Sequence, residues 1–138
     1  MMELKRLKEK HEVVRILALE DDISSFIKCD RGEWIQILMK YADDPKMNIA
    51  GIFREGDLVG YIVLQNMVYP PVSDSVYVVY SHCSVPVSEE GMGPIRDYLL
   101  GWTEECGASR LTTVTDRPEN LEPLGFVPVE KTIMELAI

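Results

Sequence analysis

Two glycines separated by one residue stand where an apolar, strand-like run gives way to a helical pattern. Gly91 and Gly93 follow the run 76–85 and precede Pro94, which suits the first position of a helix. Glycines let a backbone approach a ligand closely, and the first N–H groups of a helix have no partner inside it. This order is typical of a phosphate-binding site. The alternative is a tight turn between the strand and the helix.

A histidine near the end of the same run could move protons. His82 is one of two histidines, and a group that titrates near neutral pH suits deprotonation of an ammonium. Its alternative role is that of a half-buried, hydrogen-bonded side chain. Tyr80 could protonate a leaving thiolate or simply pack in the core. Cys83 would face away from His82 in a regular strand, which argues against a Cys–His nucleophile pair.

The run that carries these side chains is predicted to be a central strand. In a regular strand one face holds Val76, Val78, Tyr80, His82 and Ser84, and the other face is also largely apolar. Such a strand is covered by helices on both sides.

An amphipathic helix is expected from Pro94 to about Cys106, with Gly107 ending it, followed by a strand over 110–115. A strand, a crossover helix and a strand imply a parallel pair.

The rest of the chain shows ordinary helix, hairpin and turn signals. We expect a first helix within 3–19, a short helix from 20–22 to Ile27, and a helix over 34–41 that is capped by Asp30 with Glu33 and ended by 43–45. A hairpin is expected over 48–67 with its turn at 54–57, followed by a turn at 69–74. A short connection or helical turn is expected at 118–124, and a last strand over 126–136.

Size and composition predict one cytoplasmic domain over residues 1–138. Hydrophobic residues make up 46% of the chain, enough for a packed core, and the net charge of −9 disfavours nucleic-acid binding. No apolar run approaches the ~20 residues of a membrane helix, and the N-terminus lacks the apolar core of a signal peptide. The three cysteines lack CxxC spacing, which argues against a disulfide framework and against a zinc site.

The order of these motifs resembles the GCN5-related N-acetyltransferase (GNAT) family over roughly residues 48–138. In that family a Gln/Arg-x-x-Gly-x-Gly/Ala loop receives the coenzyme A pyrophosphate at a helix N-terminus, an Asn follows the next strand, and a Gly-Phe pair opens the last hairpin. The matching positions here are 88–93, Asn120 and Gly125–Phe126. The resemblance implies an α/β (α+β) fold in which an antiparallel meander precedes a splayed parallel strand pair, with helices on both faces of the mixed sheet.

The resemblance also implies a chemistry, the transfer of an acetyl group from acetyl-coenzyme A to a small-molecule or protein amine. The amine would attack the thioester carbonyl directly, with His82 as base, Tyr80 as a candidate acid, and a backbone N–H near Ser84 or Val85 polarising the carbonyl. Asn120 would contact the coenzyme or serve as a turn residue. The residues of the phosphate cradle would be Glu90, Gly91, Met92 and Gly93.

The coenzyme-binding motif is degraded at several positions. Ser88 replaces the family's Gln or Arg, the acidic residues Glu89 and Glu90 follow it, and no tyrosine lies between Asn120 and Gly125. The acidic pair would compete with a pyrophosphate, or would simply be solvated. These departures leave open a catalytically silent binding or assembly module and a sensor that binds another acyl-coenzyme A or a small ligand in the same cleft. A homodimer is a further option.

Overall fold

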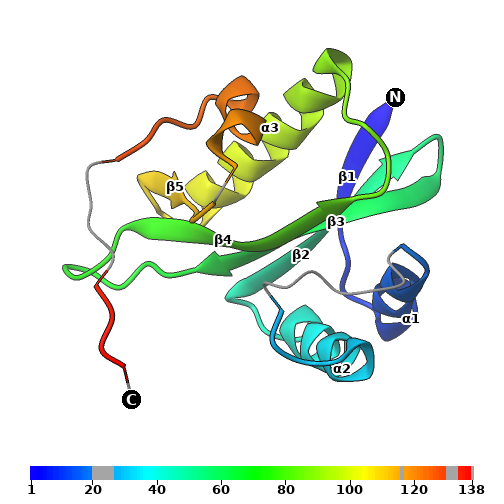
Figure 1. The fold of residues 1–138 in the computed structure, drawn as a ribbon, viewed down its shortest axis with the longest axis horizontal. Helices are drawn as coiled ribbons and strands as arrows, with labels where there is room; N and C mark the ends of the chain where they lie inside the picture. Colours follow the sequence, from blue (N-terminus) through cyan, green and yellow to red (C-terminus); the bar gives the residue numbers. More distant parts are fainter. Residues whose placement is uncertain (20–26, 116, 130–133, 138) are drawn as a thin grey trace.

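A five-stranded sheet separates two layers of helices (Figure 1). The computed structural model describes residues 1–19, 27–115, 117–129 and 134–137. The strands are β1 (Met2–Arg6), β2 (Met47–Arg54), β3 (Asp57–Asn66), β4 (Ser75–Cys83) and β5 (Arg110–Thr112), in the spatial order β1-β2-β3-β4-β5. The first four strands pair antiparallel, and β5 runs parallel to β4. The predicted mixed sheet is therefore confirmed.

The helices lie on both faces of this sheet, as expected. Helices α1 (Lys10–Val14) and α2 (Arg31–Ala42), with the 3₁₀ turn η1 (Arg15–Ala18), cover one face, and α3 (Glu89–Glu105) covers the other (Figure 1). Two further 3₁₀ turns, η2 (Pro118–Asn120) and η3 (Glu122–Leu124), follow β5. None of the helices within the described ranges is long and apolar enough to span a membrane.

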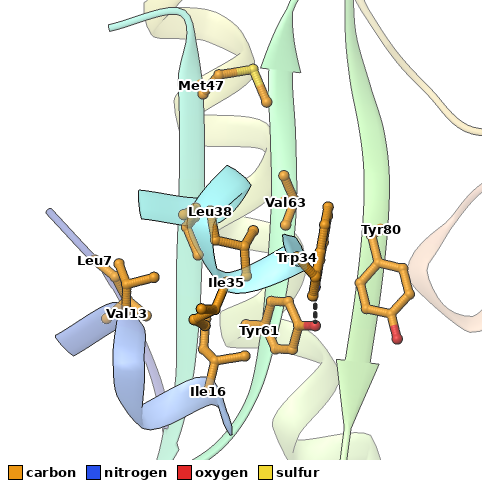
Figure 2. Packing of buried hydrophobic residues seen from close by; sticks show 11 residues of the cluster. Leu7, Val13, Ile16, Trp34, Ile35, Leu38, Met47, Tyr61, Val63 and Tyr80 are labelled. Atoms are coloured by element: carbon orange, nitrogen blue, oxygen red, sulfur yellow. Dashed lines mark hydrogen bonds between the residues drawn. The ribbon is translucent and has the colours of Figure 1, made fainter. Parts of the chain in front are cut away.

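An aromatic cluster lies in the core on the face covered by α1 and α2, among aliphatic side chains (Figure 2). Trp34 of α2 donates its indole N–H to the Tyr61 hydroxyl at 3.1 Å, and the Tyr80 ring packs edge-on against Trp34 with centroids 5.7 Å apart. Tyr61 is fully buried. Burying such a side chain contributes about 1.5–3 kcal/mol, so this cluster fixes α2 against β3 and β4.

The opposite face of the sheet holds the apolar stripe of α3. Ile95, Leu99 and Trp102 recur at helical spacing and pack against buried side chains of β2, β3 and β4. Since both faces are covered, β2 is buried continuously over residues 47–52. The expectation of a sheet with helices on both sides follows directly from such runs.

Local capping agrees with the sequence at α2, at the end of α3 and in the hairpin. Asp30 accepts a hydrogen bond from the Glu33 N–H at 2.8 Å. Gly107, with φ of 73°, donates to the Glu104 carbonyl and ends α3. The turn between β2 and β3 has positive φ at its two central residues, 55 and 56, as a tight hairpin requires.

Predicted elements at the chain ends and after α3 differ from the structure in part. The first helix expected within 3–19 is present as α1 and η1, but residues 2–6 form strand β1, since Met2 and Leu4 alternate with exposed side chains along β2. β5 ends at Thr112 and not at residue 115. Residues 126–129 and 134–137 lie in neither a helix nor a strand. The short helix predicted from 20–22 to Ile27 falls largely on residues 20–26, outside the described ranges.

The sixth residue of α3 is Pro94, not the first as predicted. The helix begins at Glu89, with Ser88 as its N-cap. Serine is a preferred N-cap residue. Because Ser88 precedes the two glycines, the helix begins before them and not after them. Pro94 removes the N–H that would bond to the Glu90 carbonyl, yet the helix continues through it to Glu105.

One extra residue interrupts the pairing of β4 with β3. Tyr80 pairs with Val63 and Val78 pairs with Leu64, so Val79 has no residue opposite it. Such a bulge reverses the faces on which later side chains lie. Val78 therefore packs on the α3 side and Tyr80 on the α1–α2 side. The prediction that these two residues share one face is wrong.

The parallel pair opens soon after it starts. β5 pairs with β4 only from Ser75 opposite Arg110 to Tyr77 opposite Thr112, whereas β4 continues to Cys83. Beyond this point, no strand in the part of the chain that the structure describes lies along that edge of β4. The splayed parallel pair is thus present as expected.

A polar clamp holds the paired end of β4 and β5 together. Asp74 accepts hydrogen bonds from the Ser109 hydroxyl and from Arg110 Nε at 3.0 Å, while its carbonyl accepts from the Ser109 N–H at 2.9 Å. The Ser109 hydrogen bond and then Arg110 hold the pKa of the Asp74 carboxyl below its usual range. The ionised carboxylate therefore stabilises the folded state.

This clamp predicts a pH-dependent loss of stability. Because the folded pKa of Asp74 is depressed, its contribution is present above the unfolded value of ~3.9 and is lost as pH falls through the folded pKa. Asp74→Asn should lower the urea midpoint at pH 7, and the difference from wild type should shrink below about pH 4. The control is Asp97→Asn on the exposed side of α3. A midpoint difference that stays constant down to about pH 2 would contradict this role.

Candidate functional site

A cleft of about 450 Å³ opens at the C-terminal end of β4, on the side of the sheet that faces α3. It lies between the end of β4, the first turns of α3 and the turns η2 and η3. Its lining comprises Ile52, Ile62, Ser81, His82, Cys83, Val87, Met92, Ile95, Glu119, Asn120, Leu121, Pro123 and Leu124. The volume falls within the ~300–1,000 Å³ typical of small-molecule sites.

This cleft brings together three residues that the sequence singled out separately. His82 comes from β4, Met92 from α3 and Asn120 from the end of η2, and all three line it. The chain therefore gathers predicted site residues from three elements at the point where β4 and β5 have separated. Asn120 is exposed and closes a 3₁₀ turn through its own N–H, which donates to the Arg117 carbonyl at 3.1 Å.

The imidazole of His82 lies next to the aromatic core. The ring is half-buried, with its centroid 6.4 Å from that of Tyr61. Since the bulge at Val79 precedes both residues, His82 and Tyr80 lie on the same face, as expected, and Cys83 packs on the opposite one. Tyr80 is buried in the aromatic cluster, in agreement with its alternative role in core packing (Figure 2).

Ser84 and Val85, one of which is predicted to polarise the thioester carbonyl through its backbone N–H, are partly hydrogen-bonded within the sheet. The Ser84 N–H and hydroxyl both donate to the Val59 carbonyl, at 2.8 and 2.9 Å. Val59 is itself the extra residue of a bulge between β2 and β3, which directs its carbonyl towards Ser84. The Ser84 N–H is therefore already hydrogen-bonded to β3, and the Val85 N–H stays the candidate donor.

The two glycines of the predicted phosphate cradle lie inside α3. The Gly91 N–H donates to the Ser88 carbonyl at 3.0 Å and to its hydroxyl at 3.3 Å. Gly91 is buried, and a Cβ there would come within 2.8 Å of Met2 Sδ, so its small size lets α3 approach β1. A Cβ on Gly93 would meet nothing within 4 Å. Gly91 thus lies at a tight contact between α3 and β1, and Gly93 lies on an exposed turn of α3.

Carboxylates lie in the lining of the cleft and in the first turn of α3. Glu89 and Glu90 are exposed in the first turn of α3, where carboxylates are favoured by the helix dipole, and Glu119 lines the cleft. Among the described residues that line the cleft, none is a lysine or an arginine.

The sequence did not indicate the apolar floor and wall of this cleft. Ile52 and Ile62 come from the hairpin, Leu124 comes from η3, and Leu121 lies between η2 and η3. All four are far from the glycine motif along the chain. A β-branched residue within a strand pattern predicts a position in the hydrophobic core. Only the folded structure reveals that these side chains border a cavity. The Pro-rich pattern of 118–124 predicted a connection, but not its contact with β4.

Two cysteines that do not line the cleft, Cys29 and Cys106, have no sign of activation. Burial, with help from Glu105, raises the pKa of the Cys106 thiol, and burial also raises that of Cys29. A raised pKa favours the unreactive thiol over the nucleophilic thiolate. In the described ranges, no three or more His, Cys, Asp and Glu side chains are placed to bind a metal ion.

Several solved structures with a similar architecture are acetyltransferases. The aminoglycoside antibiotic 6′-N-acetyltransferase AAC(6′)-Ih from Acinetobacter baumannii matches with a TM-score of 0.73 at 9% identity, over 100% of this chain and 99% of that one. A ribosomal-protein-alanine N-acetyltransferase from Brucella melitensis biovar Abortus matches with a TM-score of 0.72 at 15% identity, over 100% and 99%. AAC(6′)-Iy, in complex with a bisubstrate analog that contains coenzyme A, matches with a TM-score of 0.69 at 12% identity, again over 100% and 99%.

No protein-family model and no curated protein sequence matches the chain. At these identities the structural likeness shows the fold, which is that of the GNAT acetyltransferases.

Proposed function

We propose that this protein transfers an acetyl group from acetyl-coenzyme A to an amine. The observation that carries the proposal is the cleft at the open end of the β4–β5 pair, which holds His82, Met92 and Asn120 in one lining. The fold shared with acetyltransferases supports the reaction class. The acceptor is either a small-molecule amine or a protein amine.

The residues of the cleft suit the acyl end of such a donor. A thioester supplies an activated carbonyl when it is bound. Apolar side chains of Ile62, Met92 and Ile95 exclude water from the cavity, and the Val85 N–H is the candidate donor to the carbonyl oxygen. The edge of β4 that β5 leaves beyond Tyr77 can pair with amide groups of an extended arm, as strand edges do with peptides.

The acceptor amine would then approach from the other face of β4. His82 and Tyr80 lie on the α1–α2 side, whereas Cys83 and the cleft floor lie on the α3 side. His82 also borders the cleft, so it can accept a proton from an ammonium at the carbonyl, directly or through water. The net charge of −9 attracts cationic amines over neutral ones.

A non-catalytic binding module is the second candidate. The start of α3 favours this candidate, because the Ser88 cap and the carboxylates of Glu89 and Glu90 disfavour binding of a coenzyme pyrophosphate. Binding and turnover experiments separate the two candidates.

Blocking the cleft tests the proposed donor site. Acetyl-coenzyme A should raise the melting temperature of the wild-type protein, because a ligand that binds only the native state stabilises it. Met92→Trp, at a half-buried lining position, should fill the cavity and abolish most of the shift. The matched control is Gly101→Trp on the same helix, where a Cβ meets nothing within 4 Å. A wild-type protein without any shift at millimolar acetyl-coenzyme A would exclude the enzyme and leave the binding module.

Replacing His82 tests the proposed base. His82→Ala should lower single-turnover acetyl transfer to an amine by about 10²-fold or more, with acetyl-coenzyme A affinity nearly unchanged. A purely structural histidine would instead cost about 1–3 kcal/mol of stability, and activity would fall only with the folded fraction. His11→Ala, at the exposed position in α1, is the control. A folded His82→Ala protein with the wild-type rate would remove His82 from the mechanism.

A further inference from the structure

Coenzyme A thioesters have two chemically distinct ends, an uncharged pantetheine arm with the acyl group and a polyanionic phosphorylated ADP. We propose that this protein recognises its acyl donor through the uncharged arm alone, so that simple pantetheine thioesters bind as well as coenzyme A thioesters. This inference rests on the proposed function and specifies its donor class. It follows from the composition of the cleft and from the way in which the start of α3 is used.

The cleft suits an uncharged, partly apolar ligand. Seven of its lining residues are aliphatic or methionine side chains: Ile52, Ile62, Val87, Met92, Ile95, Leu121 and Leu124. Its polar groups are few, among them Ser81 and Asn120, which can donate to or accept from amides. Glu119 is the one carboxylate in the lining, and no lysine or arginine of the described chain accompanies it. A phosphate would meet one negative charge there and no positive one.

Two N–H groups near the start of the helix next to the cleft already bond to Ser88. Val87 and Met92, which line the cleft, flank the first turn of α3. In that turn the Gly91 N–H bonds to Ser88, and the Met92 N–H bonds to the Ser88 carbonyl at 3.2 Å. An anion attracted to the positive end of a helix needs such N–H groups to point at it.

Two carboxylates further reduce the attraction of this terminus for anions. Glu89 and Glu90 occupy the first two positions of α3 and are exposed. They already compensate the helix dipole, and a diphosphate within about 4 Å of either would lose affinity by roughly fivefold in water. Gly91, the glycine that a close phosphate contact would require, is instead packed against Met2.

The experiment dissects the donor by calorimetry with three probes: acetyl-coenzyme A, S-acetylpantetheine and the phosphorylated ADP fragment of coenzyme A. We expect the two thioesters to bind with dissociation constants within tenfold of each other, and the nucleotide fragment not to bind at millimolar concentration. Acetyl-coenzyme A binding more than tenfold tighter, or binding of the fragment by itself, would overturn the inference and leave the proposed function standing. Absence of binding by both thioesters would overturn the inference and the proposed function together.

A charge-neutralising pair of substitutions tests the role given to the carboxylates. Glu89→Gln with Glu90→Gln should tighten acetyl-coenzyme A by about fivefold at low salt and leave S-acetylpantetheine unchanged, and the gain should shrink near 0.1 M salt, where the screening length is ~10 Å. Glu104→Gln with Glu105→Gln, at the other end of α3, makes the same change in net charge and should alter neither affinity. An equal effect of the two double variants, or unchanged acetyl-coenzyme A affinity in the first, would contradict the proposal.

Discussion

The separation of β4 from β5 after three paired residues is the constraint on which the rest of the structure depends. A strand inside a sheet satisfies its backbone groups through its neighbours, and an edge must find other partners. β5 follows β4 only to Tyr77, although β4 runs on to Cys83. The Thr113 hydroxyl donates to the Val78 carbonyl at 3.1 Å and so covers the first position past the paired residues. Beyond it the edge borders the cleft, where the proposed amide-bearing ligand would take the place of a strand.

Two bulges set the chemistry of this edge. The bulge at Val59 directs a carbonyl to Ser84 and ties the end of β4 to β3, which keeps that end in place without help from β5. The bulge at Val79 turns Tyr80 and His82 to the aromatic face while Cys83 faces α3. Gly60 of β3 allows the close approach of β3 to the end of β4, since a Cβ at this position would lie 2.5 Å from the His82 carbonyl oxygen. In the proposed function, donor and acceptor would therefore meet across this single strand.

The sequence predicted those features that depend on local pattern. The hairpin, the Asp30 cap, the end of α3 at Gly107 and the parallel pair all follow from turn residues and hydrophobic period, and all are present. The face assignment of β4 failed because a bulge adds a residue without any mark in an apolar run. The start of α3 was placed too late because Pro94 reads as a first-turn residue, whereas the Ser88 cap determines the boundary.

The candidate site was predictable only in part, for a related reason. His82 is indicated by its titratable side chain near the end of a strand, and Asn120 by the resemblance to the GNAT family. The apolar lining from Ile52 and Ile62 is not indicated, because only the packed fold separates a cavity wall from a core. The position of the glycine motif between a strand and a helix predicts a phosphate cradle, which stays a prediction. In the folded chain Gly91 also packs against Met2 of β1, a contact that the sequence pattern does not indicate.

The most direct test of this account is a map of amide chemical-shift changes as acetyl-coenzyme A is titrated into the isotope-labelled protein. The account predicts changes concentrated at residues 81–85, around Met92 and at 119–124, the segments that surround the cleft. Amides of α2, on the opposite face of the sheet, should move little. Changes centred on α2, or no change at saturating ligand, would contradict the claim that the open end of the β4–β5 pair is the donor site.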